Sequence, residues 1–123
     1  MKLEDLVVYQ LAMEIGEEVF SIVGEWENFH KWTTGKQLLE AVDSIAANIS
    51  EGFGRYSYKE NKQFQYYSRG SQSETKTWLQ KAFNRDLLDN KKYNLLLTKL
   101  DELGKRHNRY IQSIGQKPVT DDE

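Results

Sequence analysis

Apolar residues recur along this chain at intervals of three and four positions, which is the spacing of one face of an α-helix. Residues 4–27 and residues 35–52 both show this pattern. The first segment carries the stripe Val8, Ala12, Ile15, Val19, Ile22 and Trp26, and the second carries Leu38, Val42, Ile45 and Ile49. Each segment is therefore predicted to form an amphipathic helix that buries one face.

Two more helices are predicted in the second half of the chain. Ser57 and Glu60 have the spacing of a capping box, which starts a helix that extends to about Leu88. The expected core side of this helix carries Phe64, Tyr67, Ser71, Trp78 and Ala82. After the turn and cap signal Asp89-Asn90 a fourth helix is expected. Its stripe is Tyr93, Leu96, Leu100, Leu103, His107, Tyr110 and Ile114.

Short connections join these four segments, and no segment alternates with the period of two that indicates a strand. Thr34 and Gln37 form another capping box at the start of the second helix, and Gly115 marks the end of the last one. The expected fold is all-α, an antiparallel up-down-up-down four-helix bundle. Residues 1–118 would form this single domain, and residues 119–123 a disordered acidic tail.

The composition excludes several classes of protein. With 123 residues, of which 38% are hydrophobic, the chain suits one folded domain. It contains no cysteine, so disulfides and thiolate metal sites are excluded. No apolar run approaches the roughly 20 residues of a membrane span, and the N-terminus lacks the apolar core of a signal peptide. We therefore expect a cytoplasmic protein that has no membrane partner.

The net charge of −2 conceals an uneven distribution. Residues 1–51 carry three lysines against ten acids, whereas residues 52–118 carry fourteen lysines and arginines against six acids. Such a division is typical of a protein with a basic binding face. It is equally consistent with acidic and basic helices that neutralise each other, within one subunit or between subunits. Both interpretations stay open at this point.

The third helix carries the strongest candidate for a binding site. At about 100° per residue, its cations fall within one stripe opposite the expected core side, with a tyrosine among them. This basic stripe consists of Lys59, Lys62, Tyr66, Arg69 and Lys76. Cations with interleaved aromatic rings can hold phosphates and stack on unpaired bases. The alternatives are a plain solvated surface and a contact with the acids of a neighbouring subunit, Glu14, Glu17 and Glu18.

A second group of polar residues falls on faces that the helical period assigns to the interior. It consists of Ser44, Asn48, Glu51, Ser71 and Glu74. Buried carboxylates and amides need hydrogen-bond partners, so we interpret the group as a structural cluster that fixes helix register or an oligomer contact. The chemical alternative is an active site with Glu51 and Glu74 as paired acids. Because no nucleophile or metal-ligand set accompanies them, we expect no catalytic residues and no enzyme activity.

No cofactor and no metal is expected either. The spacing Glu27-x-x-His30 matches half of a di-iron ligand pattern but occurs once, in a connection between helices. His107 lies on the seam of the fourth helix, where a histidine is more often a hydrogen-bonded core residue than a ligand. The Gly52–Gly54 segment follows a helix rather than a strand and lacks the lysine of a phosphate-binding loop.

The connection Trp26–Trp32 is unusually rich in aromatic residues. Aromatic side chains are enriched in the cores of protein interfaces, so this segment is a candidate for docking a partner or the next subunit. The alternative is that it closes one end of the bundle.

Taken together, these motifs resemble one bacterial protein family. The resemblance begins with the opening helix, Leu3–Ala12, and covers almost the whole chain. It continues through Gly35, Gln37, the Ser44–Gly54 stretch, Ser57–Glu60 and Gly70-Ser71-x-x-Glu74. The combined pattern is similar to the four-helix-bundle proteins encoded by intervening sequences in bacterial 23S ribosomal RNA genes. Accessory proteins of diversity-generating retroelements look like distant members of the same group.

The resemblance implies an assembly and a function as well as a fold. Members of the family tend to form homopentamers and have no known catalytic activity, and the retroelement relatives bind a reverse transcriptase and nucleic acid. The leading prediction is therefore a non-catalytic homo-oligomer, a pentamer by resemblance, that binds structured RNA or DNA or a protein partner such as a reverse transcriptase. The alternative is a scaffold for protein–protein contacts that binds no nucleic acid.

Overall fold

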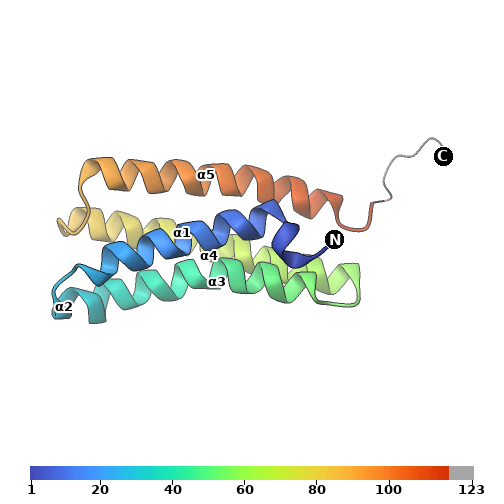
Figure 1. Ribbon diagram of the computed structural model, residues 1–123, viewed down its shortest axis with the longest axis horizontal. Helices are drawn as coiled ribbons and strands as arrows, with labels where there is room; N and C mark the ends of the chain where they lie inside the picture. The colour runs from blue at the N-terminus through green and yellow to red at the C-terminus, as the bar shows by residue number, and fades with distance from the viewer. Residues whose placement is uncertain (117–123) are drawn as a thin grey trace.

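The computed structural model describes residues 1–116, which form four long helices and no strand (Figure 1). The long helices are α1 (Val7–Gly24), α3 (Lys36–Phe53), α4 (Tyr58–Asn84) and α5 (Asn90–Ser113). Three shorter pieces complete the described chain: η1 (Leu3–Asp5), α2 (Asn28–His30) and the π-turn η2 (Lys31–Gly35). The all-α fold expected from the sequence is confirmed.

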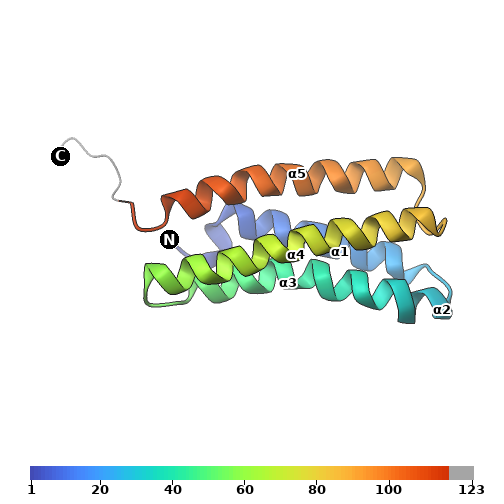
Figure 2. The same ribbon diagram turned by 180° about the vertical axis from the view of Figure 1, so that it is seen from behind.

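Helices that follow one another in the chain lie side by side. Helix α1 packs against α3 and α5, and α4 packs against α3 and α5. The two views of the ribbon show the four helices running lengthwise, with α1 in front in one view and α4 in front in the other (Figures 1 and 2). Short connections reverse the chain each time, which gives the expected antiparallel bundle.

Polar caps start two of the helices as the sequence predicts. The Ser57 hydroxyl accepts a hydrogen bond from the Glu60 amide at 3.1 Å, at the start of α4. The Asp89 carboxylate accepts one from the Lys92 amide at 2.7 Å, at the start of α5. Gly115 follows α5 with a φ of +84°, a conformation that glycine adopts at no steric cost. The predicted acidic tail lies outside the described residues.

The second helix begins differently from the prediction. The expected capping box of Thr34 and Gln37 is not formed, because the backbone is already helical at Gly35, with φ −61° and ψ −45°. Helical turns run without a break from Asn28 to the end of α3. The Thr34 side chain is buried and accepts a hydrogen bond from the Arg85 guanidinium at 2.7 Å, so it ties this turn to the end of α4 instead.

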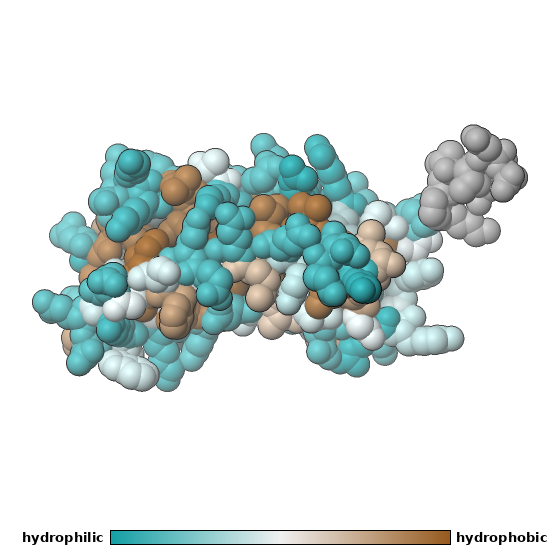
Figure 3. All heavy atoms as spheres, in the orientation of Figure 1, coloured by the Kyte–Doolittle hydropathy of each residue, from teal (hydrophilic) through white to brown (hydrophobic). Residues whose placement is uncertain are grey.

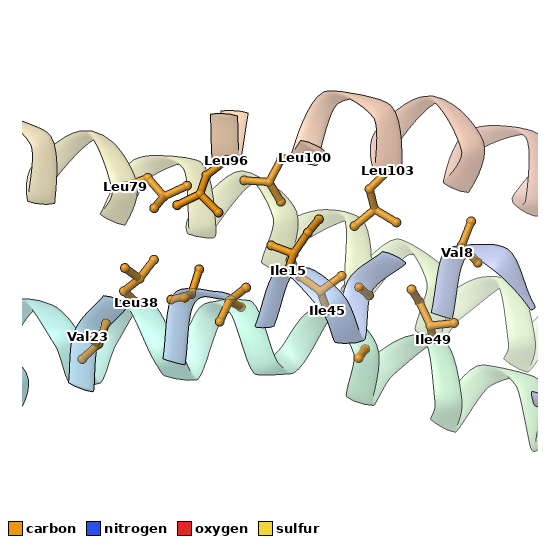
Figure 4. Close-up of a cluster of buried hydrophobic side chains, with 14 of the residues drawn as sticks. Val8, Ile15, Val23, Leu38, Ile45, Ile49, Leu79, Leu96, Leu100 and Leu103 are labelled. Carbon is orange, nitrogen blue, oxygen red and sulfur yellow. The ribbon is translucent and has the colours of Figure 1, made fainter. Parts of the chain in front are cut away.

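The bundle interior is largely aliphatic, as Figure 4 shows for one cluster. All four residues of the predicted α3 stripe are buried, and α1 and α5 also bury the faces expected from their periodicity. Burial of each such side chain stabilises the fold by about 1.5–3 kcal/mol. The fully buried leucines and isoleucines are Ile15, Leu38, Ile45, Ile49, Leu79, Leu96, Leu100 and Leu103.

The core face of α4 was predicted wrongly. The structure buries Gln65, Ser68, Gln72, Thr75, Leu79 and Ala82. Of the residues expected there only Ala82 is buried, whereas Phe64, Ser71 and Trp78 are half-buried and Tyr67 is exposed. The buried face of α4 is thus shifted by about one position, so the helix is rotated about its axis relative to the expected orientation. Counting aromatic residues as core and amides as surface produced this error, because the first half of α4 buries polar side chains.

Within residues 1–116, no helix is both long enough and apolar enough to cross a membrane.

Candidate nucleic-acid interface

A buried polar layer determines how α4 is oriented. His107 of α5 lies between Gln65 and Gln72 of α4, and all three side chains are buried. The Gln72 amide donates to His107 Nδ1 at 2.9 Å, and His107 Nε2–H donates to the Gln65 carbonyl oxygen at 2.8 Å. Burial, and secondarily the charge of Arg69, lowers the pKa of His107 from 6.5 to about 4. His107 is therefore a neutral, hydrogen-bonded core residue, as the sequence predicted.

The same layer continues from α4 to α3. The Gln65 amide donates to the Ile49 carbonyl at 3.1 Å, and the Ser68 hydroxyl donates to the Ile45 carbonyl at 2.9 Å. Gly52 permits this close approach, because a Cβ there would lie 2.6 Å from Gln65 Nε2. Since hydrogen bonds require specific distances and directions, this layer fixes the rotation of α4 about its axis and hence which residues reach its outer surface.

The polar group predicted from the sequence does not form a cluster within one chain. Its three neutral members each donate to a backbone carbonyl one turn earlier in their own helix: Ser44 to Glu40 at 2.7 Å, Asn48 to Ser44 at 2.9 Å and Ser71 to Tyr67 at 3.2 Å. Glu51 pairs with Arg55 at 2.5 Å, and Glu74 is exposed. The buried amides and hydroxyls lie one position away, on the true core face of α4. A role of the group in an oligomer contact stays a prediction.

Helix register separates the two carboxylates that were considered as paired acids. Ile45 lies opposite Ser68 and Ile49 opposite Gln65, so α3 and α4 run antiparallel with position numbers that sum to about 113. Glu74 is therefore level with position 39 or 40 of α3, eleven or twelve residues from Glu51. At 1.5 Å per residue this is roughly 17 Å along the bundle, too far for two acids to share one reacting group.

The five residues of the basic stripe lie on α4, which runs beside α5 (Figure 2). Two of them reach across to α5: Arg69 donates to Asn108 Oδ1 at 2.6 Å, and Lys76 pairs with Asp101 at 2.8 Å. This partner of Arg69 is a neutral amide, so the guanidinium is not paired with an acid among residues 1–116. The Arg69 guanidinium carbon also lies 5.3 Å from the centre of the Tyr66 ring, within the range of a cation–π contact.

The remaining two cations, Lys59 and Lys62, form no ion pair with any residue of the described chain. Lys105 of α5 adds to this surface. It lies four positions after Asp101 and three before Asn108, so it shares the face of α5 that meets the stripe, and it too has no ion-pair partner among residues 1–116. The surface therefore retains an excess of positive charge.

Charge neutralisation within the chain accounts for part of the acidic first half. Lys99 of α5 contacts Glu18 and lies 3.6 Å from Glu14, both on α1. The hydrogen bond to Glu18, with the charges of both acids, raises the pKa of Lys99 above its usual value. Glu17 instead faces α3. There the partial burial of Asp43, and secondarily the charge of Glu17, raises the pKa of Asp43. The two acids Glu17 and Asp43 have no cation paired with them in the described residues.

Apolar residues lie beside these two acids between α1 and α3, and the face of the bundle seen with α1 in front shows hydrophobic patches among hydrophilic side chains (Figure 3). A hollow of about 290 Å³ lies between the helices, with Tyr9, Met13, Gly16, Glu17, Asp43 and Ala47 among its lining residues. Beyond it Phe20 and Trp32 are 62% and 74% exposed. In the aromatic connection, Trp26 packs on the core while Phe29 is exposed. The segment thus closes the bundle with one ring and presents others to the outside.

The profile of one protein family, described as 23S rRNA-intervening sequence protein, matches residues 4–109. This chain belongs to the 23S rRNA-intervening sequence protein family. A crystal structure of a protein of unknown function from the S23 ribosomal protein family of Bacteroides thetaiotaomicron superposes with a TM-score of 0.81. The two sequences are 22% identical, and the match covers 91% of this chain and 99% of that one, which shows a shared fold. No curated protein matches this chain.

The sequence alone thus identified the family and the cations of α4. It did not predict the buried polar layer or the contribution of α5 to the basic surface of this 23S rRNA-intervening sequence protein. It missed the layer of Gln65, Gln72 and His107, although His107 on an apolar seam indicated that a polar partner must exist. It also did not join Lys105 to the basic stripe. Once the α4 orientation was known, an i, i+4, i+7 count from Asp101 would have placed Lys105 and Asn108 on the same face of α5.

Proposed function

We propose that this protein acts by binding rather than by catalysis, and that it binds structured nucleic acid on the basic surface formed by α4 and the adjacent edge of α5. The observation that carries the proposal is that Lys59, Lys62 and Arg69 have no acid partner among residues 1–116, on the helix that also exposes the Tyr66 ring. Phosphates are the ligands that such unneutralised cations attract, and each contact releases counterions from the nucleic acid.

The test is binding of a structured ribosomal-type RNA, followed by fluorescence anisotropy across a salt series. We expect affinity to fall steeply as salt rises, because several phosphate contacts are lost together. The double variant K62E/R69E should weaken binding and flatten the dependence of log K on log salt by about 1.5, since each phosphate contact contributes roughly 0.7–0.9.

The matched control reverses two lysines at the far end of the bundle. K31E/K36E makes the same change in net charge, at the start of η2 and the start of α3. It should lower affinity much less, and the salt dependence should stay as steep as in the unchanged protein. Equal effects of the two double variants would contradict a binding surface on α4, and no binding even at about 50 mM salt would contradict the proposal as a whole.

The second candidate function is a protein scaffold that assembles from copies of itself, five by resemblance. The α1–α3 surface favours it, because apolar Met13 and Phe20 are exposed there beside the acids Glu17 and Asp43. The basic surface of a second copy would complement these acids and form a head-to-tail contact that can close a ring. Sedimentation velocity separates the candidates: K62E/R69E should dissociate the assembly if α4 is a subunit contact, and an intact assembly counts against this role.

A further inference from the structure

The tyrosines of this chain divide sharply by location. Tyr9, Tyr93 and Tyr110 are half-buried and pack against the core. The other four of the seven are exposed, and all of them lie within one segment: Tyr56, Tyr58, Tyr66 and Tyr67. This segment spans the α3–α4 turn and the first turns of α4, the part of the helix that also carries the unneutralised cations. The exposed tyrosine rings and these cations therefore occupy the same end of the bundle.

The charge of this segment favours a polyanion as the covering ligand. From Arg55 to Ser73 the sequence contains four cations and one acid, Glu60. Of the cations, Arg55 pairs with Glu51, whereas the other three have no acid partner in residues 1–116. An apolar protein surface would cover the rings but would leave the ammonium groups without counter-charges. A chain that carries both phosphates and flat aromatic groups satisfies both features at once.

Tyr66 has the best position for contact with a base. Lys62 lies one turn before it and Arg69 one turn after it, on the same face of α4. The two cations are about 10 Å apart along the axis, so they bracket the ring. The Tyr66 side chain is 49% exposed, and the Arg69 guanidinium holds the ring from one side at 5.3 Å from its centre. A second planar group can stack on the exposed part of the ring.

Base pairing decides which nucleic acid can use such a ring. In a duplex the bases are already stacked, and side chains reach only phosphates, sugars and groove edges. Helix α4 is flanked by α3 and α5 along the bundle, so it cannot enter the deep, narrow major groove of duplex RNA. Unpaired nucleotides, by contrast, can turn a base onto an aromatic side chain while their phosphates meet neighbouring cations.

We infer that this surface is specific for unpaired nucleotides, such as those of a loop or a single-stranded end, with Tyr66 as the stacking platform and Lys62 and Arg69 as the phosphate contacts. The inference rests on the proposed nucleic-acid binding and specifies its ligand. It adds a chemical role for the ring, whereas the proposed function needs only the cations.

The experiment compares two labelled probes at one salt concentration: an unstructured single-stranded RNA and the blunt duplex formed with its complement. We expect the single strand to bind about tenfold more tightly, because base–tyrosine stacking is available to it alone. Y66A should lower affinity for the single strand by about tenfold and leave duplex binding unchanged. Y66F keeps the ring and should bind both probes as the unchanged protein does.

The matched control is L95A, which removes an apolar side chain from near the start of α5 that is 51% exposed, about as much as Tyr66. It should change neither affinity, and circular dichroism should show that every variant keeps its helices. If both probes bind equally, or if Y66A weakens both to the same extent, the preference for unpaired nucleotides is overturned while nucleic-acid binding stands. If neither probe binds, the proposed function itself fails.

Discussion

The two halves of α4 meet the rest of the bundle by different means. In the second half, Leu79 and Ala82 pack into a hydrocarbon core, and the Phe83 ring stacks on Tyr93 of α5 at 4.6 Å between centres. In the first half, the buried side chains are amides and hydroxyls, and Gln65 and Gln72 bond to His107 of the next helix. One helix therefore has an aliphatic interface at one end and a hydrogen-bonded interface at the other.

This difference separates stability from specificity. Aliphatic contacts are non-directional, so they stabilise many helix rotations almost equally. In the observed rotation no buried side-chain nitrogen or oxygen in the described residues lacks a partner, and turning the helix would break these directional hydrogen bonds. The basic stripe lies on the half of α4 whose rotation is fixed in this way. The polar layer thus gives up some hydrophobic burial, and in return it determines which side chains face outward.

The largest loss of stability should come from the aliphatic half. Leu100→Ala removes a fully buried side chain of α5 that packs in the hydrocarbon cluster. We expect the free energy of unfolding to fall by about 3–4 kcal/mol, from lost burial and the cavity left behind. Urea denaturation followed by circular dichroism measures it. Leu95→Ala, five residues earlier on the same helix and 51% exposed, should cost well under half as much; equal losses would contradict the description of this core.

The polar half should show a pH dependence that the aliphatic half lacks. The pKa of His107 is about 4 in the folded protein and 6.5 when the chain is unfolded. Between these values the unfolded chain binds a proton that the folded chain does not. Lowering the pH from 6.5 to 4 should therefore destabilise the fold by up to about 3 kcal/mol, and this contribution is absent above pH 6.5.

The variant His107→Gln tests this dependence, because glutamine retains hydrogen-bonding groups but does not titrate. Its absolute stability will differ, so the quantity to compare is the change in unfolding free energy between pH 7 and pH 4.5. This change should be smaller in the variant than in the unchanged protein. Identical pH profiles would mean that His107 is not held neutral by the layer.

Gly52→Ala tests how closely the polar half is packed. The added methyl group would lie 2.6 Å from Gln65 Nε2 and 2.9 Å from the Asn61 carbonyl oxygen. Because one of these neighbours is backbone, relief requires α3 and α4 to separate and the Gln65 hydrogen bonds to lengthen. We expect a loss of about 2 kcal/mol, measured by thermal or urea unfolding. A neutral effect would show that the layer tolerates movement and does not fix the rotation of α4.

The same contrast explains which features the sequence could predict. Aliphatic stripes follow directly from periodicity, so the cores of α1, α3 and α5 were predicted correctly, as were the caps Ser57 and Asp89. The family followed from motifs spread over the whole chain. These features depend on residues close in sequence, or on burial that any apolar side chain requires.

The orientation of α4 could not be predicted in this way. Glutamine and serine, like lysine, are usually exposed. Only their hydrogen-bond partners, 16 to 42 positions away in the sequence, reveal that Gln65 and Ser68 are buried. The aromatic Tyr67 and Trp78 then offered a false core face. The helical period alone grouped the residues of the basic stripe on one side of α4, but the contacts of Arg69 and Lys76 with α5 depend on the same kind of distant positions.

The smallest expected effect concerns a glycine on the outer face of α4. A Cβ added at Gly70 would meet no other atom within 4 Å, in contrast to Gly52. Alanine is favoured over glycine in a helix interior by about 1 kcal/mol, so Gly70→Ala should raise the free energy of unfolding by about that amount. Gly70 lies one turn after Tyr66, so the same variant also tests how closely a ligand approaches this turn. If nucleic acid or a neighbouring subunit packs against the backbone at Gly70, the added methyl group should weaken its binding. Unfolding and RNA-binding measurements on this one variant therefore separate the two roles, and a gain in stability with unchanged binding would place the ligand away from this turn.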